Sequence, residues 1–197
     1  MAFASLPHKK KVDWIVHQAT TITIPLGDSY LQTYPYMVDG IKYLMPLNDE
    51  KLLIAGSSIF SWMPTQSKID TTLLSASLKI ITSLKTHSLT KANLIQLAKT
   101  FRTIRGEKSV VAASKLLHFL YPDEYPIWDS RIRTKYSYSP TADPEEDKYI
   151  HYYKNVKLLI ADSQVKTACA NLNARINAAG YPGTLTTTRL VELCLFL

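Results

Sequence analysis

Cysteine, glycine and long apolar runs are all scarce in this chain of 197 residues, and each shortage excludes a class of protein. The two cysteines, Cys169 and Cys194, are too few for a disulfide framework, a Cys-ligated iron–sulfur cluster or a four-Cys zinc site. No apolar run approaches the roughly 20 residues that cross a bilayer. A signal peptide is not expected either, because three lysines at residues 9–11 stand where its apolar stretch would lie.

The motifs of several enzyme classes are missing as well. The five histidines show no HExxH spacing and no cysteine partner pattern, so no metal site is expected. There is no Gly-x-Ser-x-Gly motif and no glycine-rich phosphate loop, which argues against a serine hydrolase and against ATP use. We therefore expect no cofactor, and the six glycines and absence of repeats argue against long flexible linkers.

What the chain does contain is typical of a folded, basic protein. Apolar residues make up 46% and charged residues 20%, and twelve Tyr, five Phe and three Trp exclude a disordered tail protein. The net charge is +7 and the isoelectric point about 9.3. This composition predicts a soluble, intracellular protein with an anionic partner. A cytoplasmic or nucleoid-associated location and a monomeric state are expected.

The positive charge is concentrated in one part of the sequence. From Lys99 to Lys115 there are five cations and one acid, and residues 131–135 add three more cations, whereas acids gather in residues 143–147. A basic stripe of this kind is typical of phosphate binding. It is equally typical of a solvated helix face whose counter-charges are brought near by folding, so charge alone leaves both interpretations open.

The apolar periodicity predicts an all-α fold. Helices are expected near residues 68–84, 88–105 and 108–121, from Asp129, from Asp143, and over residues 163–179 and 187–197. The helix over 108–121 is apolar nearly all round, which predicts a central, buried helix. Residues 1–66 are expected to form an irregular N-terminal wrap with short helices, one from Asp49, and a short strand over residues 19–24, because Pro25, Pro35, Pro46 and Pro64 interrupt them. The prediction is one compact bundle of short helices, with residues 67–197 as its core.

Two short stretches carry the chemistry, Arg105-Gly106-Glu107-Lys108-Ser109 and Ile127-Trp128-Asp129-Ser130-Arg131-Ile132-Arg133. Gly106 suits a tight turn between two helices, and the first N–H groups of the next helix offer an anion site. Asp129 stands between a helix start and two arginines, which favours its ionised form. Each residue also has a plain structural interpretation: Asp129 as a helix cap, Lys108 as a solvated cation and Trp128 as core packing.

These stretches resemble segments of the helix-hairpin-helix superfamily of DNA glycosylases, which includes the 8-oxoguanine glycosylases and the endonuclease III-like enzymes. Gly106-Glu107-Lys108 with Val111-Ala112 is similar to the hairpin and the following helix, although the usual Leu-Pro-Gly-x-Gly is reduced to Gly106. The segment 127–133 is similar to the family's Val-Asp-Thr-His-Val-x-Arg, in which the Asp is catalytic. The resemblance covers roughly residues 68–160, and residues 189–197 resemble the closing helix of uncharacterised bacterial relatives.

The resemblance implies a DNA glycosylase that flips a damaged or modified base out of double-stranded DNA, hydrolyses its N-glycosidic bond and leaves an abasic site. Asp129 is the expected catalytic carboxylate, with Lys108 as its lysine partner and Lys115 as a second candidate. Hydrolysis without lyase activity is expected, because the lysine match is the poorer one. The residues expected to contact DNA are Arg105, Gly106, Lys108, Ser109, Ser130, Arg131 and Arg133. Those expected to stack on the flipped base are Trp62, Tyr121, Tyr125 and Trp128.

The biological role and two alternatives stay open at this point. Damaged bases indicate repair, whereas hypermodified bases indicate defence against phages. One alternative is a helical DNA-binding protein without catalysis, and the other is an unrelated helical interaction protein in which Asp129 is only a cap.

Overall fold

The computed structural model describes residues 3–63, 67–136 and 144–196. These residues form ten α-helices with two 3-10 turns, η1 (Phe3–Ser5) and η2 (Thr71–Leu73), and two short strands, which confirms the predicted all-α fold. The α-helices are α1 (His8–Thr21), α2 (Ser29–Lys42), α3 (Asp49–Trp62), α4 (Leu74–Ser83), α5 (Lys91–Thr100), α6 (Val110–Leu120), α7 (Ser130–Tyr136), α8 (Glu145–Ala161), α9 (Ser163–Ala178) and α10 (Thr187–Phe196). None of the helices in the described residues is long and apolar enough to span a membrane.

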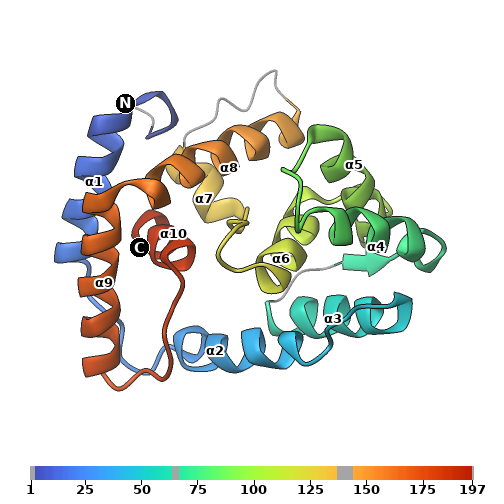
Figure 1. The fold of residues 1–197 in the computed structure, drawn as a ribbon, viewed down its shortest axis with the longest axis horizontal. Helices are drawn as coiled ribbons and strands as arrows, with labels where there is room; N and C mark the ends of the chain where they lie inside the picture. Colours follow the sequence, from blue (N-terminus) through green and yellow to red (C-terminus); the bar gives the residue numbers. More distant parts are fainter. Residues whose placement is uncertain (1–2, 64–66, 137–143, 197) are drawn as a thin grey trace.

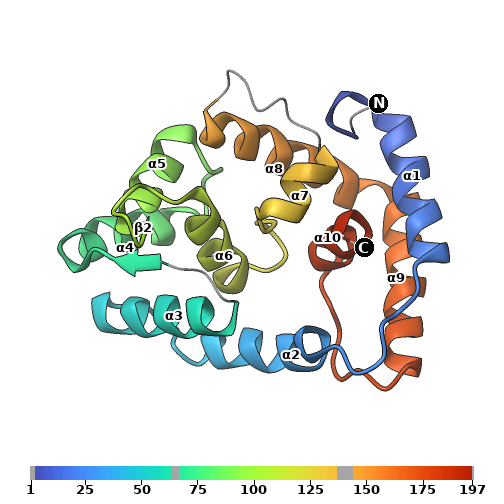
Figure 2. The ribbon, with the colours of Figure 1, turned by 180° about the vertical axis from the view of Figure 1, so that it is seen from behind.

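The helices are arranged around α10, which lies in the interior of the molecule (Figure 1). Helices α1 and α9 pack side by side along one flank, and α8 and α7 lie on another side of α10 (Figures 1 and 2). Helices α3 to α6 form the part of the molecule opposite α1 and α9. Helix α2 runs along the bottom of the view in Figure 1, between these two parts. The central position of α10 explains why all its residues from Thr188 to Leu195 are buried.

Helix starts follow the side-chain caps that the sequence supplies. Thr90, Ser109 and Asp162 each accept a hydrogen bond from a backbone N–H in the first turn of their helices. Such a cap stabilises a helix by about 1 kcal/mol. Helix α6 is buried at every position from Ala112 to Leu120, so the prediction of a central, buried helix is confirmed.

The connection between α5 and α6 differs from the predicted direct helix-to-helix turn. Helix α5 ends at Thr100, and β2 (Phe101–Thr103) pairs antiparallel with β1 (Ser67–Ile69). The chain then reverses through Gly106, whose φ of 89° is left-handed, and Arg102 bridges to Lys108. A small β-hairpin therefore stands between the helices. Its first strand, β2, also pairs with β1, which lies far back in the sequence, and this pairing overrides the local helical preference.

The N-terminal part is much more helical than predicted. Helices α1, α2 and α3 have 14 residues each, so the irregular wrap is wrong, and the strand predicted over residues 19–24 is wrong because α1 continues to Thr21. The predicted start at Asp49 is confirmed. Pro25 and Pro46 lie between helices, and Pro35 lies inside α2, where burial of the helix's apolar face compensates for the missing N–H group. Pro64 lies outside the described residues.

The C-terminal helices match their predicted positions. Helix α8 begins at Glu145 with three acids in its first turn, α9 begins at Ser163 and α10 at Thr187. Asp143 and Leu197, the predicted outer limits of two of these helices, lie outside the described residues.

Candidate functional site

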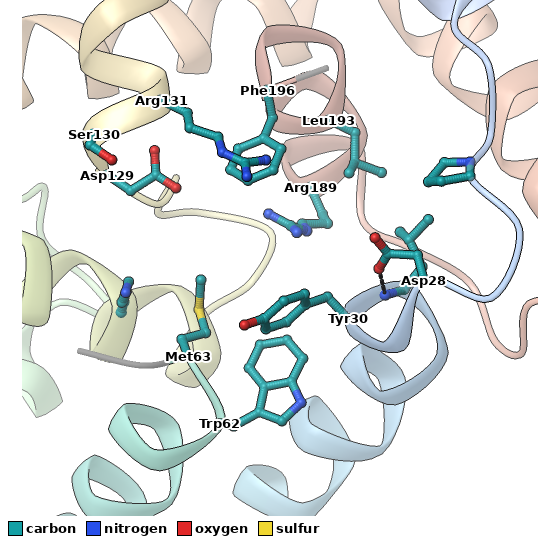
Figure 3. Close-up of a pocket in the computed structure, with 13 residues that line it drawn as sticks. Asp28, Tyr30, Trp62, Met63, Asp129, Ser130, Arg131, Arg189, Leu193 and Phe196 are labelled. Atoms are coloured by element: carbon teal, nitrogen blue, oxygen red, sulfur yellow. Dashed lines mark hydrogen bonds between the residues drawn. The ribbon is translucent and has the colours of Figure 1, made fainter.

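A cavity of about 450 Å³ opens where α2, α3, α6, α7 and α10 meet (Figure 3). Its volume is in the range of pockets that hold small organic ligands. The residues that line it are Pro25, Asp28, Tyr30, Leu31, Trp62, Met63, Lys115, Asp129, Ser130, Arg131, Arg189, Leu193 and Phe196. Figure 3 shows Asp129 and Arg131 on one side, Asp28 on the opposite side, and Arg189 pointing into the space between them.

Asp129 lies at the wall of this cavity, where α7 begins. Its Oδ1 accepts the N–H of Ile132 at 2.9 Å, so the carboxylate caps α7, as the structural interpretation predicts. Burial lowers the pKa of Lys115, and the negative charge of Asp129 partly opposes that change. Burial also acts to lower the pKa of Arg189, but Glu192, with a smaller contribution from Asp129, raises it. Asp129 is therefore a helix cap and a cavity residue at once, and the two interpretations do not compete.

The loop that presents Asp129 is held by buried side chains from three helices. The carbonyls of residues 125 and 126 accept hydrogen bonds from His118 (2.8 Å) and Tyr149 (3.0 Å), and the N–H groups of residues 127 and 128 donate to Glu192 and to Ser114 (3.0 Å). All four side chains are at most 1% exposed. Breaking any of these bonds leaves an unpaired polar group in the core, so the backbone before Asp129 is held in one position.

Arg189 belongs to a buried network behind the cavity. Its Nη1 donates to Oε2 of Glu192 at 2.9 Å, and its Cζ lies 5.3 Å from the ring centroid of Tyr34. Burial raises the pKa of Glu192 to about 7, although the positive charge of Arg189 acts in the opposite direction. The guanidinium is thus fixed in position by a partner that lies outside the cavity.

His118 completes this network as a neutral side chain. Burial lowers its pKa to about 3. Because the carbonyl of Tyr125 can only accept, Nδ1 of His118 carries the proton, and Nε2 accepts from the hydroxyl of Tyr34 at 2.7 Å. The imidazole therefore connects the Asp129 loop to α2 and takes no part in proton transfer near neutral pH.

Lys115 reaches the cavity from the middle of α6. Its side chain is 7% exposed, and burial lowers the pKa of its amine while the charge of Asp129 opposes that change. Lysine is among the residues least often buried. The sequence signal was a single lysine inside an otherwise apolar helix, and its register differs from that of the resembled family.

Lys108 does not reach the cavity. It lies on the exposed hairpin before α6, and its amine forms an ion pair with Glu146 of α8. The expectation that Lys108 is the lysine partner of Asp129 is therefore corrected, because the hairpin directs it toward α8. Lys115 is the lysine that shares a cavity with Asp129.

The residues expected to contact DNA fall into two separate groups. Arg105 and Gly106 are exposed at the tip of the hairpin. Ser109 is buried and its Oγ accepts the N–H of Ala112 at 3.1 Å, which corrects the expected anion site at this helix start.

The second group lies at α7. Ser130 and Arg131 are exposed and line the cavity, and the guanidinium of Arg131 stacks over Phe196 with its Cζ 4.5 Å from the ring centroid. Arg133 is exposed beside them and pairs with Glu145 at 2.9 Å. Of these residues, Ser130 and Arg131 lie at the cavity, whereas Arg133 lies outside its lining.

Of the four aromatic residues predicted to stack on a base, Trp62 lines the cavity. Trp128 and Tyr125 are in the core, at 0% and 2% exposure, which corrects their assignment to the pocket. Tyr121 lines a different groove, next to Tyr125. Tyr30, which was not predicted from the sequence, also lines the cavity. The ring centroids of Tyr30 and Trp62 are 5.3 Å apart, and the two rings are nearly perpendicular at 82°.

The described residues contain no group of three or more His, Cys, Asp or Glu side chains placed to hold a metal ion. Burial raises the pKa of the thiols of Cys169 and Cys194 to about 12, so neither is a reactive thiolate near neutral pH. No protein family, curated protein or solved structure matches this chain in the comparisons made.

Proposed function

We propose that the protein is a DNA glycosylase that hydrolyses the N-glycosidic bond of a base extruded into the cavity around Asp129. The observation that carries this proposal is the placement of Asp129 and the buried Lys115 on one cavity, beside the aromatic rings of Tyr30 and Trp62. A carboxylate and aromatic surfaces serve the hydrolysis of this bond in a flipped nucleotide, and a buried amine can replace water as the nucleophile.

Asp129 is the catalytic residue in this proposal. Cleavage builds positive charge on the sugar, and a fixed carboxylate near C1′ stabilises that charge. Water adds its oxygen to C1′ and gives a proton to the carboxylate, while the base leaves with the electron pair of the broken bond and takes up a proton. The hydrogen-bonded loop before Asp129 supports this role, because it holds the carboxylate in place without rearrangement.

Lys115 offers the same sugar a second nucleophile. Its lowered pKa increases the share of neutral amine, which can attack C1′ in place of water. Opening of the sugar ring then gives a Schiff base, which borohydride reduces to a stable covalent link between protein and DNA. Trapping with borohydride therefore distinguishes a hydrolase from a glycosylase with lyase activity.

The basic side chains beside the cavity are suited to the DNA backbone. Arg131 and Arg133 are both exposed on α7, and Arg131 also lines the cavity that would receive the base. Phosphate contacts position a protein on DNA without reading its sequence. Recognition of the base then belongs to the cavity itself.

The test is release of bases from DNA by the wild type and by Asp129→Asn. Substrates are oligonucleotides with damaged bases and phage DNA with hypermodified or plain pyrimidines, and alkali reveals abasic sites as strand breaks. Asn also caps helices well, so this variant keeps the cap and removes the charge. Asp162→Asn is the matched control, because Asp162 caps α9 in the same way outside the cavity lining.

The expected result is alkali-labile breaks on one class of substrate, reduced at least about 100-fold in Asp129→Asn and unchanged in Asp162→Asn. Salt-sensitive DNA binding without breaks on any substrate would reject catalysis and leave the DNA-binding alternative. Absence of both breaks and binding would reject the proposal altogether.

A further inference from the structure

Arg189 is a buried cation with an unused hydrogen-bond donor. The residue is 8% exposed and lines the cavity, whereas its Nε is itself covered and has no hydrogen-bond partner among the described residues. Nη1 is occupied by Glu192, so the Nε–Nη2 edge is the side of the guanidinium that a ligand can use. Buried N–H groups are nearly always paired in folded proteins. The unpaired donor therefore points to an acceptor supplied by a ligand.

The charges around the cavity favour a neutral ligand. The lining contains three cations, Lys115, Arg131 and Arg189, and two carboxylates, Asp28 and Asp129. Glu192 lies directly behind Arg189 and offsets its charge. An anion such as phosphate would meet the two carboxylates inside the cavity. A flat, neutral ring with a hydrogen-bond acceptor is the ligand that fits.

We propose that Arg189 donates to the carbonyl oxygen of the extruded base, so that the cavity selects keto bases over amino bases. This inference rests on the proposed function, since it concerns the base that enters the same cavity. A guanidinium edge suits a carbonyl oxygen with a neighbouring ring nitrogen, the pattern that arginine reads on guanine. An exocyclic amino group at that position is itself a hydrogen-bond donor, so it would face the N–H groups of Arg189 and leave Nε unpaired. Arg189 is a specificity residue here, and Asp129 remains the catalytic one.

The test compares bases that differ in one exocyclic group. Hypoxanthine, with O6 beside N7, is paired with adenine, with an amino group beside N7, in duplexes whose 2′-fluorinated sugar resists cleavage, and dissociation constants are measured at fixed salt. The wild type is expected to bind the duplex with hypoxanthine roughly 10- to 100-fold more tightly than the duplex with adenine. Inorganic phosphate at the same ionic strength should not abolish that difference.

Three variants separate the hydrogen bond from charge and from stability. Arg189→Lys keeps the charge and loses the planar edge, so most of the keto preference should disappear. Arg189→Met alone leaves the carboxylate of Glu192 buried without its partner, and the double variant Arg189→Met with Glu192→Gln removes both charges in case the single variant does not fold. Arg131→Met is the control at the exposed side of the cavity, and it should weaken both members of a pair equally.

The outcomes distinguish this inference from the proposed function. Suppose that base release is lost in Asp129→Asn. If the folded Arg189 variants then keep the keto preference, or if the wild type shows no keto preference, the inference about Arg189 is overturned and the glycosylase proposal stands. If no base is released from any DNA yet the keto preference depends on Arg189, the inference about base recognition stands and catalysis is rejected. A phosphate that competes through Arg189 would overturn the choice of a neutral ligand.

Discussion

Glu192 on α10 accepts a hydrogen bond from the backbone N–H of Ile127, two residues before Asp129. The other oxygen of the same carboxylate receives Nη1 of Arg189. One buried side chain therefore connects the loop that presents Asp129 to the arginine that points into the cavity. Because all three groups lie in or against the core, a change at Glu192 is expected to affect both the loop and the arginine.

Glu192→Gln is predicted to change the pH dependence of folding stability. Burial raises the pKa of Glu192 to about 7, above the roughly 4.3 of an unfolded chain, so the folded protein holds this proton more tightly. The resulting stabilisation is full below about pH 4 and is lost as the pH rises to about 7. Gln lacks this titration, so the stability of the variant relative to the wild type should increase from pH 5 to pH 8, as measured by thermal melting.

His118 acts in the opposite direction but does not disturb this comparison. Its pKa is lowered to about 3, so its contribution is present above about pH 6.5 and is lost as the pH falls. That term is present in both proteins and cancels in their difference to first order. Glu107→Gln, on the exposed hairpin, is the control, and parallel stability curves for wild type and Glu192→Gln would contradict the prediction.

Ser114→Ala is predicted to destabilise the protein by about 1–3 kcal/mol, because it leaves the buried N–H of Trp128 without its acceptor. Urea denaturation measures the free energy of unfolding. Ser88→Ala, in an exposed loop, should change it by less than about 0.5 kcal/mol. Equal effects of the two variants would show that the hydrogen bond to the Asp129 loop contributes nothing.

Lys115→Met and Lys108→Met are predicted to separate the two lysines functionally. Lys115 shares the cavity with Asp129, so its removal is expected to reduce base release by about 100-fold and to abolish any borohydride-trapped complex. Lys108 pairs with the buried carboxylate of Glu146 outside the cavity lining, so its removal should leave release within about twofold of the wild type. A larger effect at Lys108 than at Lys115 would reverse the assignment made from the structure.

Much of the helical fold was predictable because local signals agree with the tertiary structure. Thr90 and Ser109 cap the helices that follow them, and the nearly all-apolar residues of α6 indicated its central position. The prolines led to a wrong prediction for the N-terminal part, because a proline does not end a helix whose apolar face is buried against the rest of the protein. Pro35 is retained inside α2, where Leu31, Tyr34 and the other apolar residues of one face are buried.

The site was only partly predictable, for a different reason. Asp129 and Arg131 were found because they follow one another in a recognisable segment. Arg189 and Glu192 were missed because nothing in the sequence of a terminal helix shows that it occupies the centre of the molecule. Lys115 was ranked below Lys108 because it stands inside the predicted buried helix and its register differs from that of the resembled hairpin. That a cavity opens beside this helix follows from tertiary packing, which the sequence does not show.

Gly106→Ala and Gly40→Ala are predicted to have effects of opposite sign. Gly106 has a φ of 89°, which is strained for any residue with a Cβ, so its replacement should destabilise the protein by about 1 kcal/mol. Gly40 lies inside α2 with open space around its Cβ position, so alanine there should stabilise by about 0.5–1 kcal/mol. Thermal melting of the two variants beside the wild type checks both signs, and destabilisation by Gly40→Ala would refute the second.

Arg131→Gln and Arg133→Gln are predicted to reduce the salt dependence of DNA binding. DNA binding releases about one counterion for each phosphate contact, so a variant that loses one contact releases about one counterion fewer. The slope of the log of the binding constant against the log of the salt concentration should therefore become shallower by about 1 per variant. Both side chains are exposed on α7, and Arg131 also lines the cavity. The measurement is a fluorescence titration of one duplex at several salt concentrations.

Lys166→Gln supplies the control for this titration, since it removes the same charge from the exposed surface of α9, outside the cavity lining. A general electrostatic attraction would respond equally to all three substitutions, because each lowers the net charge by one. A specific path of the DNA backbone across α7 requires the slope to change in the two arginine variants and to stay constant in Lys166→Gln. Equal changes would therefore reject α7 as the DNA-binding surface even if the protein binds DNA.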